Sequence, residues 1–216
     1  MTAPGRRGPR RPRPVRSALG IALAVLAVTT SGCAGPSAAA PAPSIEAASV
    51  PVTRPPVSVL PAVMEASRPV RVQIPSIGVD SELMDLGLQD DGTLEVPPAG
   101  FPAGWFTGAP TPGERGPAVI AGHVDWGGSP GVFYDLRDVV AGDQISVVRG
   151  DGSTAVFRVQ RVGQFAKDAF PTDAVYGDLD HAGLRVVTCG GDFDSAAHSY
   201  VDNTIVFADL VDSRAR

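Results

Sequence analysis

From residue 70 onward the sequence is divided into short apolar or alternating runs, separated by turns rich in glycine, proline and aspartate. Val70, Val72 and Ile74 alternate with polar residues, which is the period of a half-buried strand, and Pro75 ends that run. Many short strands with little helix are typical of a closed or nearly closed β-barrel. The pattern therefore predicts a mainly β domain.

Further strands are predicted along the same region. Clean alternation on both sides of Gly150-Asp151-Gly152 indicates a hairpin. One or two helical turns are expected between Phe133 and Val140, and a turn at residues 90–92. The predicted strands are residues 70–74, 93–96, 118–121, 144–148, 155–162, 184–188 and 204–210.

The first 33 residues have the composition of an export signal. Six arginines precede an apolar, uncharged run at residues 17–30, and small residues then lead into Cys33. This ending resembles a bacterial lipoprotein processing site, although Thr30 stands where such sites usually carry leucine. An uncleaved signal anchor or plain secretion are the alternatives. All three place the domain outside the cytoplasm, and the first two anchor it to the membrane.

Residues 34–69 are rich in alanine, proline, serine and valine, without a regular apolar period. Such a stretch cannot bury enough surface to offset the entropy of ordering, so we expect a disordered spacer. The expected organisation is thus a signal or anchor at residues 1–33, a spacer at 34–69 and a catalytic domain at 70–212.

The charge pattern excludes several functions. The net charge is −5, and no basic stripe follows residue 70, which argues against a nucleic-acid partner. Asp90, Asp91 and Asp125 lack the spacing of a calcium loop, and one thiol with scattered histidines cannot form a structural zinc site. No metal or cofactor is predicted, and a monomer is the default expectation.

Cys189 is the only cysteine outside the signal segment. A lone thiol in an exported domain is buried and inert, paired to another chain, or reactive. It follows the apolar run 184–188 and precedes Gly190-Gly191, where a substrate backbone could approach closely. A nucleophile and a buried small apolar residue are both compatible with this segment.

His123 also follows an apolar run, at residues 118–121. A thiol that attacks an amide needs a base or an imidazolium neighbour, and imidazole titrates near neutral pH. The chain has three histidines, and His181 and His198 lie in polar loop sequence, where we expect solvated surface residues. His123 could instead be a hydrogen-bonded loop histidine.

Together the two segments resemble the motifs of the sortase family. The matching segments are Pro117 to His123 for the histidine motif, Gly131 to Leu136 for the segment after it, and Leu184 to Cys189 for the strand ending in Thr-Cys. Residues 190–203, with Gly190-Gly191, Phe193-Asp194, Tyr200 and Asp202-Asn203, look most like the actinobacterial class F group. The resemblance runs from about residue 69 to 211.

This resemblance implies an eight-stranded closed β-barrel and a cysteine transpeptidase. Cys189 would attack a C-terminal sorting-signal peptide of a secreted protein, and His123 would protonate the leaving amine. The thioester would then pass to an amine acceptor, such as a cell-wall peptide. Two alternatives remain open: a non-catalytic or hydrolysis-only surface module that keeps the barrel, and a cysteine transpeptidase acting directly on peptidoglycan stems. The second is disfavoured because its Ser-His-Gly-Cys type loop is absent.

Sortases carry a third catalytic residue, an arginine after the cysteine, and this sequence departs from that pattern. Residues 195–208 contain no lysine or arginine, and the corresponding position lies near Asn203. Arg185 is the candidate in sequence, because strand alternation places it on the face of Cys189. It lies four residues away, roughly 13 Å along a strand, and could instead pair with Asp180.

A few other residues near these motifs have two interpretations. Asp125 follows the histidine and could orient it. Trp105, Phe106 and Trp126 could line a peptide groove, but aromatic residues in a barrel of this size are expected in the core.

Overall fold

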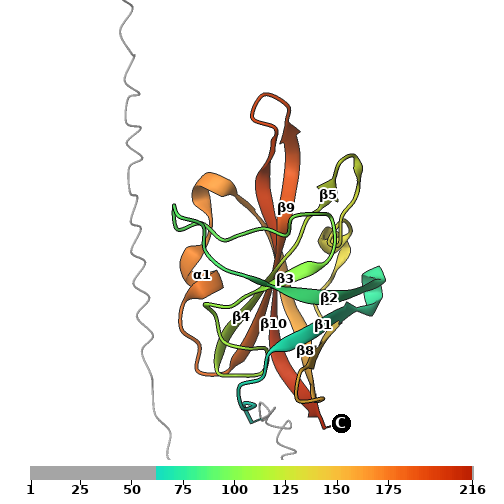
Figure 1. The fold of residues 1–216 in the computed structure, drawn as a ribbon, viewed down its shortest axis with the longest axis vertical. Coiled ribbons are helices and arrows are strands. Elements are labelled where there is room, and N and C mark those ends of the chain that lie inside the picture. Colours follow the sequence, from blue (N-terminus) through green and yellow to red (C-terminus); the bar gives the residue numbers. More distant parts are fainter. Residues whose placement is uncertain (1–61, 216) are drawn as a thin grey trace, which may run out of the picture. The chain divides into compact units, whose positions relative to one another are not determined.

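The computed structural model describes residues 62–215, in which eight strands close into a barrel (Figure 1). This confirms the mainly β, eight-stranded fold with few short helices. Around the barrel the order is β1, β2, β3, β4, β9, β10, β8 and β7, and β7 pairs with β1. The strands are β1 (Pro69–Ile74), β2 (Val79–Leu86), β3 (Ala103–Phe106), β4 (Gly116–Ala121), β7 (Gln144–Arg149), β8 (Thr154–Ala166), β9 (Ala182–Asp194) and β10 (Ser199–Arg214).

The barrel interior follows from the alternation of side chains along each strand. In β1, Val72 and Ile74 are fully buried, whereas Val70, at the register shift between Pro69 and Arg71, is 37 % exposed. The central cluster also contains Phe133 and Phe157, both fully buried. The expected hairpin joins β7 to β8, with Gly152 at a positive φ of 83° that favours glycine. One apolar core therefore fills the barrel.

Two strand pairs are parallel, β2 with β3 and β4 with β9, and the other pairs are antiparallel. Every residue of β4 is buried, because side chains on one face point into the barrel and those on the other are covered from outside. The cover includes α1 (Thr172–Tyr176), which contacts β4. Figure 1 shows α1 lying against the side of the barrel.

Beneath α1 a second apolar cluster forms on the outer face of the barrel. Its buried members are Val119 of β4, Val175 of α1, and Ile205 and Phe207 of β10. The other short helices are 3₁₀ turns: η1 (Pro75–Ile77), η2 (Leu136–Asp138) and η3 (Lys167–Ala169). The turn η2 confirms the helical turn expected after Phe133.

Three strand predictions need correction. Residues 93–96 form no strand; a single bridge joins Leu94 to Leu88, and the Glu95 carboxylate accepts a hydrogen bond from the Gly87 backbone N–H. β9 does not end at Cys189 but continues to Asp194, and β10 begins at Ser199 and ends at Arg214. Their hairpin extends beyond the rest of the barrel in Figure 1. The sequence prediction also missed β2 and β3.

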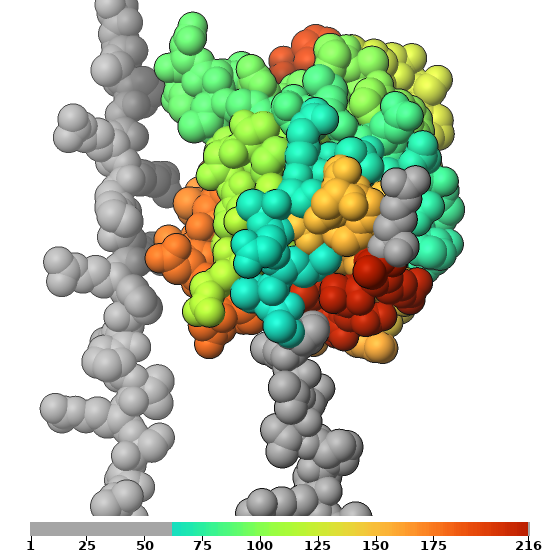
Figure 2. Space-filling model, turned by 60° about the horizontal axis from the view of Figure 1, so that its bottom comes forward, coloured from blue at the N-terminus to red at the C-terminus, as the bar shows by residue number. Residues whose placement is uncertain are grey.

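The two ends of the described chain lie near each other. Arg149 at the end of β7 donates a hydrogen bond to the Glu65 carbonyl, just before β1. Figure 2, in which the lower end of Figure 1 faces the reader, shows the first described residues beside the last part of β10. Within residues 62–215 no helix is both long and apolar enough to cross a membrane. The predicted signal at 1–33 and most of the predicted spacer lie outside the described residues.

His181 is not a solvated surface residue, as the sequence suggested. Its ring contacts the Asp180 carboxylate through Nδ1 at 2.8 Å and the Asp209 carboxylate through Nε2 at 3.1 Å. Its side chain is only 26 % exposed. The hydrogen bond to Asp180, opposed by burial and reinforced by Asp209, raises the pKa of His181. By contrast, His198 is exposed, as expected.

Removing a large side chain from the barrel interior is expected to destabilise the fold. Phe157→Ala should lower the free energy of unfolding by about 3–5 kcal/mol, because it removes a fully buried ring and leaves a cavity. Val140→Ala is the matched control, since Val140 is 60 % exposed. Urea denaturation measures both, and an equal effect of the two variants would contradict the assignment of the core.

The His181 ion pairs predict a pH-dependent stability. A raised pKa means that the folded state binds the proton more tightly, so the stabilisation is complete below about pH 6.5 and is lost as pH rises through the folded pKa. The difference in unfolding free energy between the wild type and His181→Gln should therefore shrink as the pH rises above about 6.5. His198→Gln serves as control. A difference that grows with pH would refute the arrangement.

Candidate active site

The parallel pairing of β4 with β9 brings the two predicted catalytic residues together. Every pair between these strands is separated by 66 positions, from Gly116 and Ala182 to Ala121 and Val187. The same 66 positions separate His123 from Cys189, which lie two residues beyond the last pair of this ladder. Neighbouring strands lie about 4.8 Å apart, and residues at matched positions share a face. Because hydrogen bonds join Gly122 to Val187 and Thr188, we infer that the two side chains lie close together on the same face.

A hydrogen bond between the intervening residues fixes this register. The Thr188 hydroxyl donates to the Gly122 carbonyl oxygen at 2.8 Å, and the Gly122 N–H donates to the Val187 carbonyl at 3.1 Å. Thr188 is 4 % exposed, so the first of these bonds is shielded from water. The residue before the histidine is thus tied to the residue before the cysteine.

His123 is held by its ring and by its backbone. Its Nε2 lies 2.7 Å from the Pro97 carbonyl oxygen; a carbonyl only accepts, so Nε2 carries the proton and Nδ1 is free to exchange one. The ring packs against Trp126 with centroids 4.7 Å apart. The His123 carbonyl accepts a bond from Phe133, and a Cβ at Gly131 would come within 2.4 Å of that oxygen. Only glycine fits there.

Cys189 is a free thiol of intermediate exposure, as a nucleophile must be. Across the ladder on its other side it pairs directly with Asn203 of β10. Burial raises the pKa of Tyr200, and the nearby charges of Asp125 and Cys189 add to the shift. The Tyr200 phenol therefore stays protonated at neutral pH close to the thiol.

Three aligned rows cross the outer face of β4, β9 and β10. The lowest row is Val119, Arg185 and Phe207, and the next is Ala121, Val187 and Ile205. In the third row Cys189 pairs with Asn203, and His123 follows two residues after the end of β4. The apolar cluster beneath α1 includes members of the two lower rows. The thiol of Cys189 and the side-chain amide of Asn203 therefore lie at the end of this apolar face, near the imidazole of His123.

Comparison with known proteins decides the family. A model of the sortase domain matches residues 72–211, which is nearly the whole barrel. The chain belongs to the sortase family. Members of this family are cysteine transpeptidases that act on sorting signals and amine acceptors, typically outside the cytoplasm. No curated protein matches the sequence.

Solved structures agree on the fold. Sortase C1 from Streptococcus agalactiae is 18 % identical with a TM-score of 0.52, over 66 % of this chain and 67 % of that chain. A lid mutant of sortase A from Corynebacterium diphtheriae is 22 % identical with a TM-score of 0.52, over 69 % and 73 %. Sortase A from Listeria monocytogenes is 15 % identical with a TM-score of 0.51, over 69 % and 90 %.

In this sortase Arg185 lies two rows from Cys189 and makes its hydrogen bonds elsewhere. Its Nε donates to the Ala174 carbonyl of α1 at 3.0 Å, and a terminal nitrogen donates to the Leu184 carbonyl at 3.1 Å. The guanidinium also lies 5.0 Å from the centroid of the Phe207 ring. The alternative partner proposed from sequence, Asp180, contacts His181 instead. Arg185 thus fastens α1 to the barrel.

The aromatic residues near the motifs differ in their surroundings. Trp105 is 8 % exposed and belongs to the core, as expected. The expectation is wrong for Trp126, which is 48 % exposed in the small hairpin of β5 (Asp125–Trp126) and β6 (Ser129–Pro130). Sequence reasoning also missed the Pro97 carbonyl and the proximity of Tyr200 to the thiol, because both depend on contacts distant in sequence.

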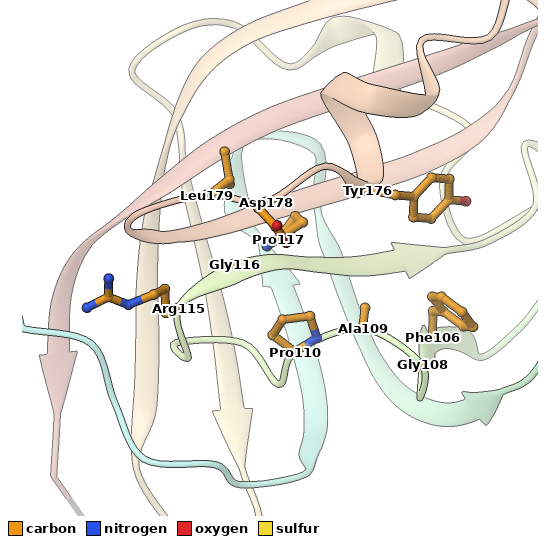
Figure 3. A pocket seen from close by; sticks show the side chains of 10 residues that line it. All are labelled: Phe106, Gly108, Ala109, Pro110, Arg115, Gly116, Pro117, Tyr176, Asp178 and Leu179. Atoms are coloured by element: carbon orange, nitrogen blue, oxygen red, sulfur yellow. The ribbon is translucent and has the colours of Figure 1, made fainter.

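A pocket of about 480 Å³ lies at the other end of β4, at Gly116 and Pro117 (Figure 3). Phe106 and Tyr176 form one end of it, with ring centroids 6.3 Å apart, and Arg115 extends away at the other end. Gly116 at this end of β4 lies seven residues before the histidine, roughly 23 Å along an extended strand. The pocket does not hold the reacting groups.

Thr188→Val is expected to weaken the pairing of β4 with β9. It keeps the side-chain shape but leaves the Gly122 carbonyl without its partner, at a cost of about 1–3 kcal/mol in unfolding free energy. Thr204→Val is the control, because Thr204 is the equally buried cross-strand partner of Thr188. Urea denaturation should separate the variants, and equal losses would contradict a special role for the Thr188 bond.

Proposed function

We propose that this sortase is an active transpeptidase with Cys189 as nucleophile and His123 as acid and base. The observation that supports this most is the register of β4 and β9, because its last pair, Ala121 and Val187, stands two residues before both the imidazole and the partly exposed thiol. The substrate is a C-terminal sorting-signal peptide of a secreted protein. The acceptor is an amine, in keeping with the family, and a cell-wall peptide is the proposed source.

In the first half of the reaction, the Cys189 thiolate attacks the carbonyl carbon of the scissile amide. A tetrahedral intermediate forms with its negative charge on the former carbonyl oxygen. Protonated His123 then gives its Nδ1 proton to the departing nitrogen, the C–N bond breaks, and a thioester remains on Cys189. The bond from Nε2 to Pro97 holds the ring orientation while Nδ1 exchanges its proton.

In the second half an amine attacks the thioester carbonyl. His123 takes the proton of the incoming amine, the C–S bond breaks, and the thiolate of Cys189 is regenerated. The thioester conserves the energy of the cleaved amide, so no nucleotide is consumed. Water in place of the amine gives hydrolysis, which is the outcome of the alternative hydrolysis-only module.

The remaining assignments are proposals from the sequence pattern. Residues 190–203 support a class F sortase, and residues 1–33 support export with a lipoprotein-type or signal anchor at the membrane. The Ala/Pro-rich spacer then holds a monomeric catalytic domain away from the membrane surface, where cell-wall amines are found.

The role of Arg185 as the third catalytic residue remains a prediction. Its arginine side chain has the charge that the family uses on the substrate carbonyl, and it shares the outer face with Cys189. To reach the substrate it would have to release the Ala174 and Leu184 carbonyls. Arg185→Ala tests this directly.

The full chain should form an acyl adduct on Cys189 when it is incubated with a sorting-signal peptide library. Intact-mass spectrometry would detect the adduct, which should be absent in Cys189→Ala. His123→Ala should slow its formation by about 10²–10⁴-fold, because proton transfer to the leaving amine is lost.

His198→Ala is the matched histidine control, since His198 is exposed on the β9–β10 hairpin. If a thiol reagent labels Cys189 but no peptide does, the non-catalytic surface module becomes the better interpretation. Release of free acid without transfer to an added amine would support the hydrolysis-only module.

A further inference from the structure

The tetrahedral intermediate of the proposed reaction needs a group that stabilises its negative oxygen. Cationic side chains are scarce here, since β9 and β10 carry no lysine or arginine between Arg185 and Arg214. Cys189 pairs with Asn203 and Gly190 with Asp202 in the β9–β10 ladder, so the side chains of β10 are neighbours of the thiol on that side.

Resting on the proposed function, we infer that the Asn203 side-chain amide donates the hydrogen bond that stabilises this oxygen. Asn203 is the direct cross-strand partner of Cys189, and side chains opposite each other in an antiparallel pair share a face. Their Cβ atoms are expected to lie about 4.5–5.5 Å apart, which leaves room for one carbonyl group between sulfur and amide nitrogen. Asn203 is partly exposed, so a substrate can reach it.

Neighbouring polar residues do not occupy the side-chain amide of Asn203, so the amide can bind a substrate. Among residues 62–215, its side chain makes no hydrogen bond, whereas the neighbouring Asp202 accepts one from Gln164 at 2.6 Å. His123 follows β4, which flanks β9 on the side opposite β10, and its neighbour Gly122 is bonded to Thr188. The substrate carbonyl would thus have the acid and base on the β4 side of the nucleophile and the donor on the β10 side.

The amide is neutral, which sets it apart from the arginine of the family pattern. A neutral donor stabilises a developing oxyanion less than a cation does, because charge-assisted hydrogen bonds are about twice as strong. Asn203 would therefore support acylation of Cys189 without making the site cationic. The Arg185 guanidinium, by contrast, donates a hydrogen bond to the Ala174 carbonyl of α1.

Two chemical probes on the full chain separate this role from a structural one. p-Nitrophenyl acetate acylates a thiol through a tetrahedral oxyanion, whereas iodoacetamide alkylates it by displacement at a saturated carbon, without one. Asn203→Ala should slow acetylation of Cys189 by about 10²–10³-fold, the loss typical of removing one oxyanion donor. Its alkylation rate should stay unchanged. Both rates are measured by intact-mass spectrometry.

Val201→Ala is the matched control, because Val201 lies on the same strand and is 45 % exposed; both of its rates should equal those of the wild type. Equal acetylation of Asn203→Ala and wild type, or a parallel fall in both rates, would overturn the assignment. Selective loss of acetylation in Arg185→Ala, without loss in Asn203→Ala, would transfer the role to Arg185.

These outcomes also separate the inference from the proposed function. A wild type that iodoacetamide alkylates, but that neither the ester nor any sorting peptide acylates, refutes the proposed transpeptidase itself. A wild type that is acylated as fast as Asn203→Ala refutes only the role of Asn203.

Discussion

The structure depends on the parallel register between β4 and β9. This pairing is long-range, since 66 residues separate each residue from its partner, and it closes the barrel on the side that carries the reactive groups. The Thr188 hydroxyl bond to the Gly122 carbonyl fixes the register one residue before the thiol. The same ladder therefore supports the fold and fixes how Cys189 lies relative to the chain that leads into His123.

The outer face of the barrel changes character along these strands. Near α1 it is apolar and covered, and Arg185 contributes to the cover by bonding the Ala174 carbonyl. Beyond α1 it becomes polar and partly exposed, where Cys189 pairs with Asn203 and His123 follows the end of β4. A buried apolar region thus supports the polar residues at its end, which is the arrangement that the proposed acyl transfer would need.

Much of this could be predicted from the sequence, because alternation and turn residues are local signals. They gave the barrel strands around Val72, the β7–β8 hairpin and the positions of His123 and Cys189 at the ends of apolar runs. The alternation even placed Arg185 on the correct face. The pairing of His181 with Asp209 and of His123 with the Pro97 carbonyl joins residues 28 and 26 positions apart, and no local pattern encodes such contacts. Residues 93–96 look like a strand but lack a partner beyond one bridge.

The shared register of β4 and β9 limits where residues can be inserted into such a chain. Insertions in the loops between β4 and β9 leave the two strands aligned, so the site tolerates a long and variable intervening chain. One residue added within β4, after Ala118, would instead shift His123 out of line with Cys189 and turn its ring toward the barrel interior. The histidine and the cysteine can thus be far apart in sequence and still lie next to each other, provided that the number of residues in β4 and in β9 does not change.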